Sequence, residues 1–379
     1  TKKFLMEELE KNVPASRRSP PGAYIIIDGF AAIQVLKKPK VPGEDDDDED
    51  KNKWKAETFA DVAESILSSI CNTAYPRPAR IDFVIDRYWD KSIKRTERER
   101  RKEKTDGRRI QINSEKQRAP SAWSDYMKNS YNKEELPGFL LKEWTSHGMK
   151  YAKCLGETML FLCHESECSR LSVVQGAITW IVVPDLQCNT EEADTRMFLH
   201  ASHISANTNA SAIVIRSPDT DVLVLAMHFK QLINTPMYIL RQGKQKAWKY
   251  VNISALCDHH GQAICKALPG LHAFSGCDST SGFNGKGKKK FFQQLQKDFS
   301  FQNSMAELGN EVPATEQIVQ KFEKAVCKLY GHRGTDINRV RYDMLSKGAE
   351  SFDVPPTKDA FKLHVERANY QAYVWKKSC

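Results

Sequence analysis

The chain has 379 residues, 40% of them hydrophobic and 28% charged, and its formal net charge is +9 at pH 7. A chain of this length can bury a large core, so we expect one α/β domain with insertions. No apolar run approaches the roughly 20 residues that cross a bilayer, and the N-terminal residues do not resemble a signal peptide. The composition argues against a membrane-spanning protein and favours an intracellular one with a polyanionic partner.

The first third of the chain predicts a β–α–β unit. Residues 1–22 are charged and then rich in Pro, Ser and Arg, which indicates a flexible lead-in. Apolar runs at 24–27 and 81–85 predict strands, and residues 57–70 between them have apolar side chains at helical spacing. Strands that are apolar throughout are typical of a parallel sheet with helices on both faces. Further strands are predicted at 179–183, 213–216 and 237–240.

A strongly basic segment follows the second predicted strand. Between residues 87 and 118, Lys and Arg greatly outnumber Asp and Glu, and few apolar residues interrupt them. One interpretation is a solvated helical insertion stabilised by helix-spaced ion pairs, and the other, which we prefer, is a surface that binds phosphates. Residues 119–178 carry aromatic residues and apolar stripes that predict a helical extension of this insertion. Residues 313–379 are also predicted to be helical.

Acidic residues lie at or close behind several of the predicted strands. Asp28, Asp86 and Asp219 each follow an apolar run, and taken singly each could be an ordinary turn or helix-start residue. Parallel strands bind ligands beyond their carboxyl ends, so these carboxylates can converge at one sheet edge. Hard oxygen ligands of this kind select Mg²⁺ or Mn²⁺, and two such ions can support phosphodiester hydrolysis. The candidate metal ligands are Asp28, Asp86, Glu192, Asp194, Asp219, Asp221 and Asp278.

A glycine- and lysine-rich stretch at 276–290 gives a second line of argument. Gly285, Lys286 and Gly287 open a predicted amphipathic helix, so free backbone N–H groups and lysines meet at one point. Such a helix start suits a phosphate backbone. A single Gly-x-Gly is a weak signal, but here it follows soon after Asp278.

These motifs resemble the flap endonuclease/XPG-type branch of the PIN-like nucleases. Order and approximate spacing agree over roughly residues 23–300. The family has Glu-Ala-Glu where this chain has Glu192-Ala193-Asp194. The matching segments are Ile25-Ile26-Ile27-Asp28, Val84-Ile85-Asp86, Glu192-Ala193-Asp194, Ser217-Pro218-Asp219-Thr220-Asp221, and Gly276-Cys277-Asp278 with Gly285-x-Gly287.

The resemblance implies a PIN-like/FEN-like fold: a central, mostly parallel twisted sheet flanked by helices, with a helical arch and a helix-hairpin-helix-like element. It implies two Mg²⁺ or Mn²⁺ ions bound by the seven acids, and a monovalent cation at the 276–288 hairpin. The domains expected from it are a nuclease domain at 23–300, with the arch at 87–178 and the hairpin element at 253–300, and a helical extension at 301–379. In the arch, Lys91 and Arg95 would hold the scissile phosphate. The nucleic-acid contacts would come from Lys94, Arg98, Gly285, Lys286, Gly287 and Lys288.

The sequence also departs from that family. The family's Met-Gly-Ile-x-Gly-Leu start has no counterpart, and Asp194 replaces a longer Glu, which shortens one ligand arm. Because the chain does not begin with Met, a fragment of a longer protein is one interpretation. We predict a nuclear, metal-dependent, structure-selective nuclease acting on DNA or RNA. The main alternative is a nucleic-acid-binding scaffold that has lost catalysis. A phosphatase using Asp28 is disfavoured, because the segment lacks a second Asp two residues on.

Other site chemistries have less support. The chain has ten cysteines without a Cys-x-x-Cys pair, which predicts reduced, mostly buried thiols. Two groups contain zinc-ligand residue types but lack paired spacing, so buried cysteines and surface histidines are the preferred interpretation. There is no P-loop and no Gly-x-Ser-x-Gly elbow, so no nucleotide cofactor or serine-esterase chemistry is expected. The two groups are Cys163, His164 and Cys168, and Cys257, His259, His260 and Cys265.

Overall fold

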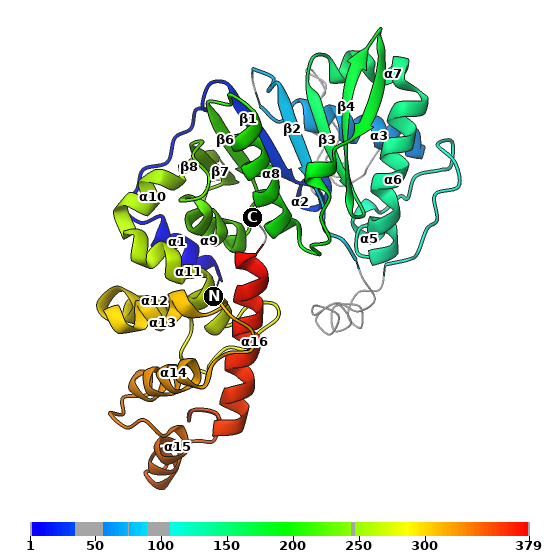
Figure 1. Cartoon of the computed structure of the whole chain (residues 1–379). Helices are drawn as coiled ribbons and strands as arrows, with labels where there is room; N and C mark the ends of the chain where they lie inside the picture. Colours follow the sequence, from blue (N-terminus) through cyan, green and yellow to red (C-terminus); the bar gives the residue numbers. More distant parts are fainter. Residues whose placement is uncertain (1, 35–55, 75, 89–106, 244–246, 378–379) are drawn as a thin grey trace. The chain divides into compact units, whose positions relative to one another are not determined.

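The structure is a computed structural model that describes residues 2–34, 56–74, 76–88, 107–243 and 247–377 (Figure 1). The chain divides into two compact units. The sheet unit comprises residues 16–218 and 235–250, and the helical unit comprises residues 1–15, 219–234 and 251–379. Each unit is assembled from segments that are distant in sequence, and the nuclease domain at 23–300 stays a prediction.

The sheet has eight strands in the order β5-β4-β3-β2-β1-β6-β7-β8. The pairs β2–β1, β1–β6 and β6–β7 are parallel, as the sequence predicts. The strand β3, which was not predicted, also pairs parallel with β2. The strand predicted at 179–183 corresponds to β5, which pairs antiparallel with β4, as β4 does with β3. The strands are β1 (Ala23–Asp28), β2 (Arg80–Val84), β3 (Met159–His164), β4 (Glu167–Val174), β5 (Ala177–Val182), β6 (Ala212–Arg216), β7 (Met237–Gln242) and β8 (Trp248–Asn252), the last of which runs into the helical unit.

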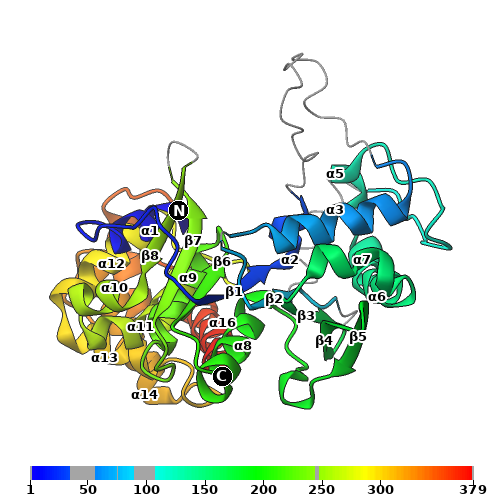
Figure 2. The same cartoon turned by 90° about the horizontal axis from the view of Figure 1, so that it is seen from above.

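Helices cover both faces of this sheet (Figure 2). On one face lie α3 (Phe59–Cys71), α6 (Ser130–Ser146) and α7 (Gly148–Leu155), and on the other lies α8 (Ala193–Asn207). This arrangement explains why β1 is apolar throughout, since Ile25, Ile26 and Ile27 are all buried. Shorter elements are α2 (Gly29–Gln34), α5 (Trp123–Tyr126) and a 3₁₀ turn at Pro184–Leu186.

Local sequence signals account for α3 and for its attachment. The Thr58 hydroxyl accepts a hydrogen bond from the Asp61 backbone N–H, and the Asp61 carboxylate accepts one from the Thr58 backbone N–H, which together form a capping box. The indole N–H of Trp144 donates to the Ala63 carbonyl oxygen, 3.1 Å away. This bond ties α6 to α3 inside the apolar layer.

Residues 119–178 are not purely helical, which corrects the predicted helical extension. The apolar run near Leu160 forms the buried strand β3, and β4 follows it after a short turn. A short, fully buried apolar run does not distinguish a strand from a helix by its periodicity, which is why the prediction failed there.

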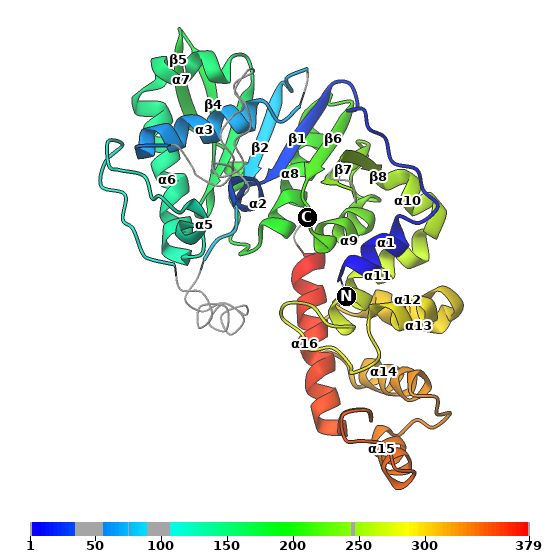
Figure 3. The same ribbon diagram turned by 180° about the vertical axis from the view of Figure 1, so that it is seen from behind.

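The helical unit is built around α11 (Gln262–Phe274), which packs against α9, α12, α13 and α16 (Figure 3). The Phe274 ring is the centre of an aromatic cluster with Phe283, Phe291, Phe322 and Phe361. The other helices are α1 (Lys2–Leu9), α9 (Thr220–Phe229), α10 (Ile253–His260), α12 (Lys288–Lys297), α13 (Phe299–Glu307), α14 (Glu316–Leu329), α15 (Ile337–Ser346) and α16 (Lys358–Lys376).

The start of the chain is ordered, contrary to the predicted flexible lead-in. Residues 2–9 form α1, and Leu5, Met6 and Leu9 are buried against the helical unit. Their spacing of three to four residues is that of one helix face, a signal obscured by the charged residues around it.

In the described part of the chain, no helix is long and apolar enough to cross a membrane.

Candidate metal centre

The sheet reverses its winding direction between β1 and β6. From β1 the chain adds β2 and β3 on one side, then returns to place β6 and β7 on the other. In open parallel sheets such a switch point leaves a crevice at the carboxyl ends of the two strands, where ligands bind. Asp28 is the last residue of β1, and Ser217 directly follows β6. The Ser217 hydroxyl lies 3.4 Å from Asp28 Oδ2, so the two strand ends meet there.

Asp86, two residues after the end of β2, contacts the start of α8. Its Oδ1 accepts a hydrogen bond from the Ala193 backbone N–H at 2.8 Å, and the Arg87 backbone N–H donates to the Glu191 carbonyl oxygen, also at 2.8 Å. Ala193 lies between Glu192, the N-cap residue of α8, and Asp194 in its first turn. Two motifs that are 107 positions apart in sequence are therefore adjacent, as the sequence predicts.

These acids also have ordinary structural roles. Asp28 Oδ1 accepts the Ala31 backbone N–H at the start of α2, and Asp86 serves the start of α8 in the same way. A carboxylate at a helix N-terminus is stabilised by the unpaired N–H groups and by the helix dipole. Such contacts hold a carboxylate in place at the end of a strand.

The donor set of the sheet unit fits a hard divalent cation. Its members lie at the ends of β1 and β2 and at the start of α8: they are the carboxylates of Asp28, Asp86, Glu192 and Asp194, with the Ser217 hydroxyl 3.4 Å from Asp28. Oxygen ligands of this kind suit Mg²⁺ and Mn²⁺. The Glu192 side chain is 5% exposed, and a buried carboxylate needs a compensating positive charge or donors.

The helical unit holds the other three predicted acids, and a lysine joins two of them. Asp221 is buried, and its Oδ1 lies 2.7 Å from His272 Nε2 while its Oδ2 lies 3.0 Å from Lys2 Nζ. The same ammonium lies 3.1 Å from Asp278 Oδ1. Asp219 caps α9 by accepting the Asp221 backbone N–H. Lys2 therefore supplies the positive charge that these carboxylates need.

Electrostatics inside this group follow from its burial and its charges. Burial alone would lower the pKa of the Lys2 ammonium, but Asp221, Asp219 and Asp278 raise it above its ordinary value. Burial opposes ionisation of Asp221, yet His272 and Lys2 hold the pKa of its carboxyl well below the usual range. Burial and the neighbouring Asp221 charge raise the pKa of Asp219. Asp221 thus loses its proton more readily than Asp219.

His272 completes this arrangement. Burial and the nearby Lys288 lower the pKa of His272 to about 4, so its ring is neutral at pH 7 and Nε2 carries the proton donated to Asp221. Its Nδ1 is buried and has no hydrogen-bond partner within the described ranges. The ring stacks on Trp375 with a centroid distance of 5.5 Å. Neither Lys2 nor His272 was predicted, since both meet Asp221 from distant parts of the chain.

The 276–288 hairpin is present, with one correction to its predicted contacts. Lys288 is buried, and its ammonium donates to the His272 carbonyl oxygen at 2.8 Å and to Ser275 Oγ at 3.1 Å. It therefore holds the loop onto α11, and the predicted contact of Lys288 with a nucleic-acid backbone is wrong. Lys286 is half-buried over the Tyr330 ring, while Gly285 and Gly287 face open space. These three stay candidates for phosphate contact.

The predicted arch residues Lys91, Lys94, Arg95 and Arg98 lie outside the described residues.

A scan against protein-family models finds no match to this chain, and a search of curated proteins finds none either.

Proposed function

We propose that this protein is a divalent-metal-dependent nuclease that hydrolyses phosphodiester bonds of DNA or RNA. The observation that supports the proposal is that Asp28 ends β1 beside Ser217 at the switch point of the parallel sheet, and that Asp86, just beyond the neighbouring strand β2, accepts a hydrogen bond from the start of α8. The PIN-like fold, the helix-hairpin-helix-like role of the 276–288 loop and a nuclear location are part of the same proposal and rest on the resemblance.

Asp28, Asp86, Glu192 and Asp194 of the sheet unit would hold the metal. The resemblance assigns further ligands, Asp219, Asp221 and Asp278, which belong to the helical unit. When bound, Mg²⁺ or Mn²⁺ ions would activate water and stabilise the leaving oxygen of the phosphodiester. The protein's own part is to hold the carboxylates rigidly through α2 and α8 and to attract the polyanion with its net charge of +9.

One observation favours a second candidate, a nucleic-acid-binding scaffold without catalysis. The Lys2 ammonium lies 3.0 Å from Asp221 and 3.1 Å from Asp278, so both carboxylates already have a cationic partner without a divalent ion. A protein that had lost turnover would bind nucleic acid and show no metal-dependent cutting.

Cleavage assays separate the two candidates. End-labelled single-stranded, duplex, 5′-flap and hairpin DNA and RNA would be incubated with the protein and Mg²⁺, Mn²⁺ or EDTA. We expect metal-dependent cutting that falls at least about 100-fold in Asp28→Asn and in Asp219→Asn, because even the outer partners of metal ligands contribute about 10–100-fold. Binding without cutting under every condition would favour the scaffold.

A matched control is available in Asp336→Asn. Asp336 caps α15 by accepting the backbone N–H groups of Asn338 and Arg339, as Asp219 caps α9. Asn is also a good N-cap residue, so each substitution removes a charge and keeps the cap. Equal activity in Asp219→Asn and Asp336→Asn would contradict the assignment of Asp219.

A further inference from the structure

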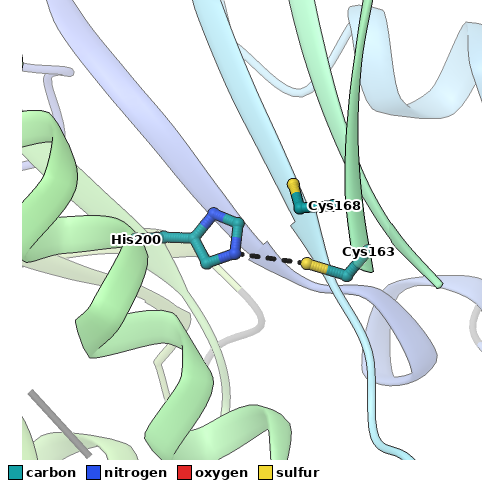
Figure 4. Close-up of side chains that lie close together, drawn as sticks. All are labelled: Cys163, Cys168 and His200. Carbon is teal, nitrogen blue, oxygen red and sulfur yellow. Dashed lines mark hydrogen bonds between the residues drawn. The ribbon is translucent and has the colours of Figure 1, made fainter. Parts of the chain in front are cut away.

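Two thiols and an imidazole meet in the interior of the sheet unit. Cys163 on β3 and Cys168 on β4 are directly opposite in the antiparallel pair, and His200 reaches them from α8 (Figure 4). One ligand atom from each of the three lies within 4.8 Å of the others, and all three side chains are fully buried. Cys163 Sγ is 3.2 Å from His200 Nε2. The sequence had grouped Cys163 and Cys168 with His164, which instead approaches Ser169 Oγ.

The far side of the imidazole is held as it is in metal-binding histidines. His200 Nδ1 lies 2.6 Å from Asp82 Oδ1, and the Arg80 guanidinium donates to both oxygens of Asp82 at 2.7 and 2.8 Å. Arg80 keeps Asp82 ionised, so the Nδ1 proton is directed to the carboxylate. Nε2 then faces the thiols and shares a hydrogen bond with Cys163. A histidine that ligates a metal usually donates its other ring N–H to a carboxylate in this manner.

Three simpler explanations fit less well. The cluster is fully buried, so no substrate can reach Cys163 as a nucleophile. Two thiols can pack in an apolar core without polar neighbours. Here the hydrogen-bonded side chains of His200, Asp82 and Arg80 are buried beside them, and burying each of these polar groups costs free energy. A Cys163–Cys168 disulfide would remove the thiol proton and leave the buried His200 Nε2 without its partner.

We infer that Cys163, Cys168 and His200 bind a thiophilic metal ion, with Zn²⁺ as the expected occupant. Two thiolates and one imidazole are typical zinc ligands, and bond lengths of about 2.3 Å to sulfur and about 2.0 Å to nitrogen place tetrahedral ligand atoms roughly 3.5–4 Å apart. Binding releases two protons, the one held between His200 Nε2 and Cys163 and the one on Cys168, so a neutral complex forms from Zn²⁺, two thiolates and a neutral imidazole. A non-protein ligand would take the fourth position.

Neighbouring charge favours the ionised sulfur that a metal needs. The Arg196 guanidinium is buried and donates to the carbonyl oxygens of Glu165 and Glu167, which fixes it at the β3–β4 turn. The positive charge of this guanidinium acts on the nearby Cys163 sulfur. The metal would join β3, β4 and α8, and its role is structural. This inference does not depend on the nuclease proposal.

The test is the metal content of the full chain purified with a thiol reductant. We expect about one equivalent of zinc by elemental mass spectrometry, and near-ultraviolet thiolate-to-metal absorption when Co²⁺ replaces it. Cys168→Ser should lose both. Cys71→Ser, which alters a buried thiol of α3 outside the cluster, should keep both. Asp82→Asn should weaken zinc binding about 10–100-fold in competition with a chromophoric chelator.

Several results would overturn the inference. One is that reduced wild-type protein shows no Co²⁺–thiolate absorption. Another is that Cys168→Ser retains zinc. The third is that the wild-type protein, after alkylation of its free thiols, has two unmodified cysteines and a mass two hydrogens too low, which would indicate the disulfide. Should Cys168→Ser fail to fold by circular dichroism, the wild-type Co²⁺ spectrum and chelator competition decide the question without the variant.

Discussion

The ammonium of Lys2 occupies a position between two carboxylates, Asp221 and Asp278. Hydrogen bonds to charged groups contribute about 1.5–3 kcal/mol each when they are sheltered from water. The pair with Asp221 is sheltered, because that carboxylate is 3% exposed. We therefore regard Lys2 as the residue that fixes α1 to the start of α9, both within the helical unit.

Replacing Lys2 with Met should lower the free energy of unfolding by about 1–3 kcal/mol at pH 7. The pKa of Asp221 is depressed in the folded protein, so its stabilising contribution is present above the unfolded value of about 4 and is lost as the pH falls through the folded value. The difference between wild type and variant should therefore shrink in acid. Urea unfolding followed by circular dichroism measures it.

Lys3→Met is the matched control, since it removes an exposed ammonium from the same helix. Its unfolding free energy should stay within about 0.5 kcal/mol of wild type. If both variants lose the same stability, the Lys2 contacts do not contribute as described.

Three histidines make the helical unit sensitive to mild acid: His272 and His364 are buried, and His228 is partly buried. Burial lowers the pKa of His228, His272 and His364 to about 4, whereas an unfolded histidine has a pKa of about 6.5. Between these values the unfolded chain binds more protons, so stability falls as the pH decreases from about 6.5 towards 4. Each histidine can account for about 3 kcal/mol at the acid end.

Urea titrations at pH 7, 6, 5 and 4.5 test this dependence. His272→Gln removes one titrating group while an amide can still donate to Asp221, so its stability should fall less steeply over this range. A wild-type stability that does not change between pH 7 and pH 4.5 would show that these rings are not held neutral.

At the scale of elements, the loop between α11 and α12 depends on one tight turn. Gly276 has φ of +103°, and a Cβ there would lie 2.9 Å from the Gly282 Cα. Gly285 also has positive φ, at +65°, but a Cβ there would meet nothing within 4 Å. The two glycines therefore share a left-handed backbone and differ in the space around them.

Gly276→Ala should cost about 2–4 kcal/mol of unfolding free energy, and Gly285→Ala about 1–2 kcal/mol, because only the first adds a clash with backbone to the cost of the left-handed conformation. Chemical denaturation of the two variants provides the comparison. Equal losses would mean that the loop can move Gly282 away without cost.

The elements that sequence reasoning located are those with a strong local signal. The strand ending at Asp28 and the strand before Asp86 are short apolar runs followed by a polar residue, and α3 has both a capping box and a clear apolar face. The contacts that it missed join distant residues. Lys2 and Asp221 are 219 positions apart, and His200 and Asp82 are 118 apart, so no local pattern marks either pair.

At the scale of the whole molecule, the division into two units was not predictable from composition. The main segment of the sheet unit is residues 16–218. The helical unit consists of the two segments that flank it, residues 1–15 and 219–234, together with residues 251–379. The Pro-rich stretch at 14–22 coincides with the first of these crossings, and the later ones have no comparable linker. The parallel sheet was predicted, but the position of its switch point between β1 and β6 comes only from the strand order.

The central claim is that the carboxylates at this switch point bind a hard divalent cation. Its most direct test is a Mn²⁺ titration followed by electron paramagnetic resonance, which reports free Mn²⁺, for wild type, Asp28→Asn and Asp336→Asn. Mn²⁺ prefers oxygen ligands, so the buried thiol cluster does not interfere. We predict binding in wild type and in Asp336→Asn, and affinity at least about tenfold weaker in Asp28→Asn. Identical titrations for all three proteins, or no binding by wild type, would contradict the claim.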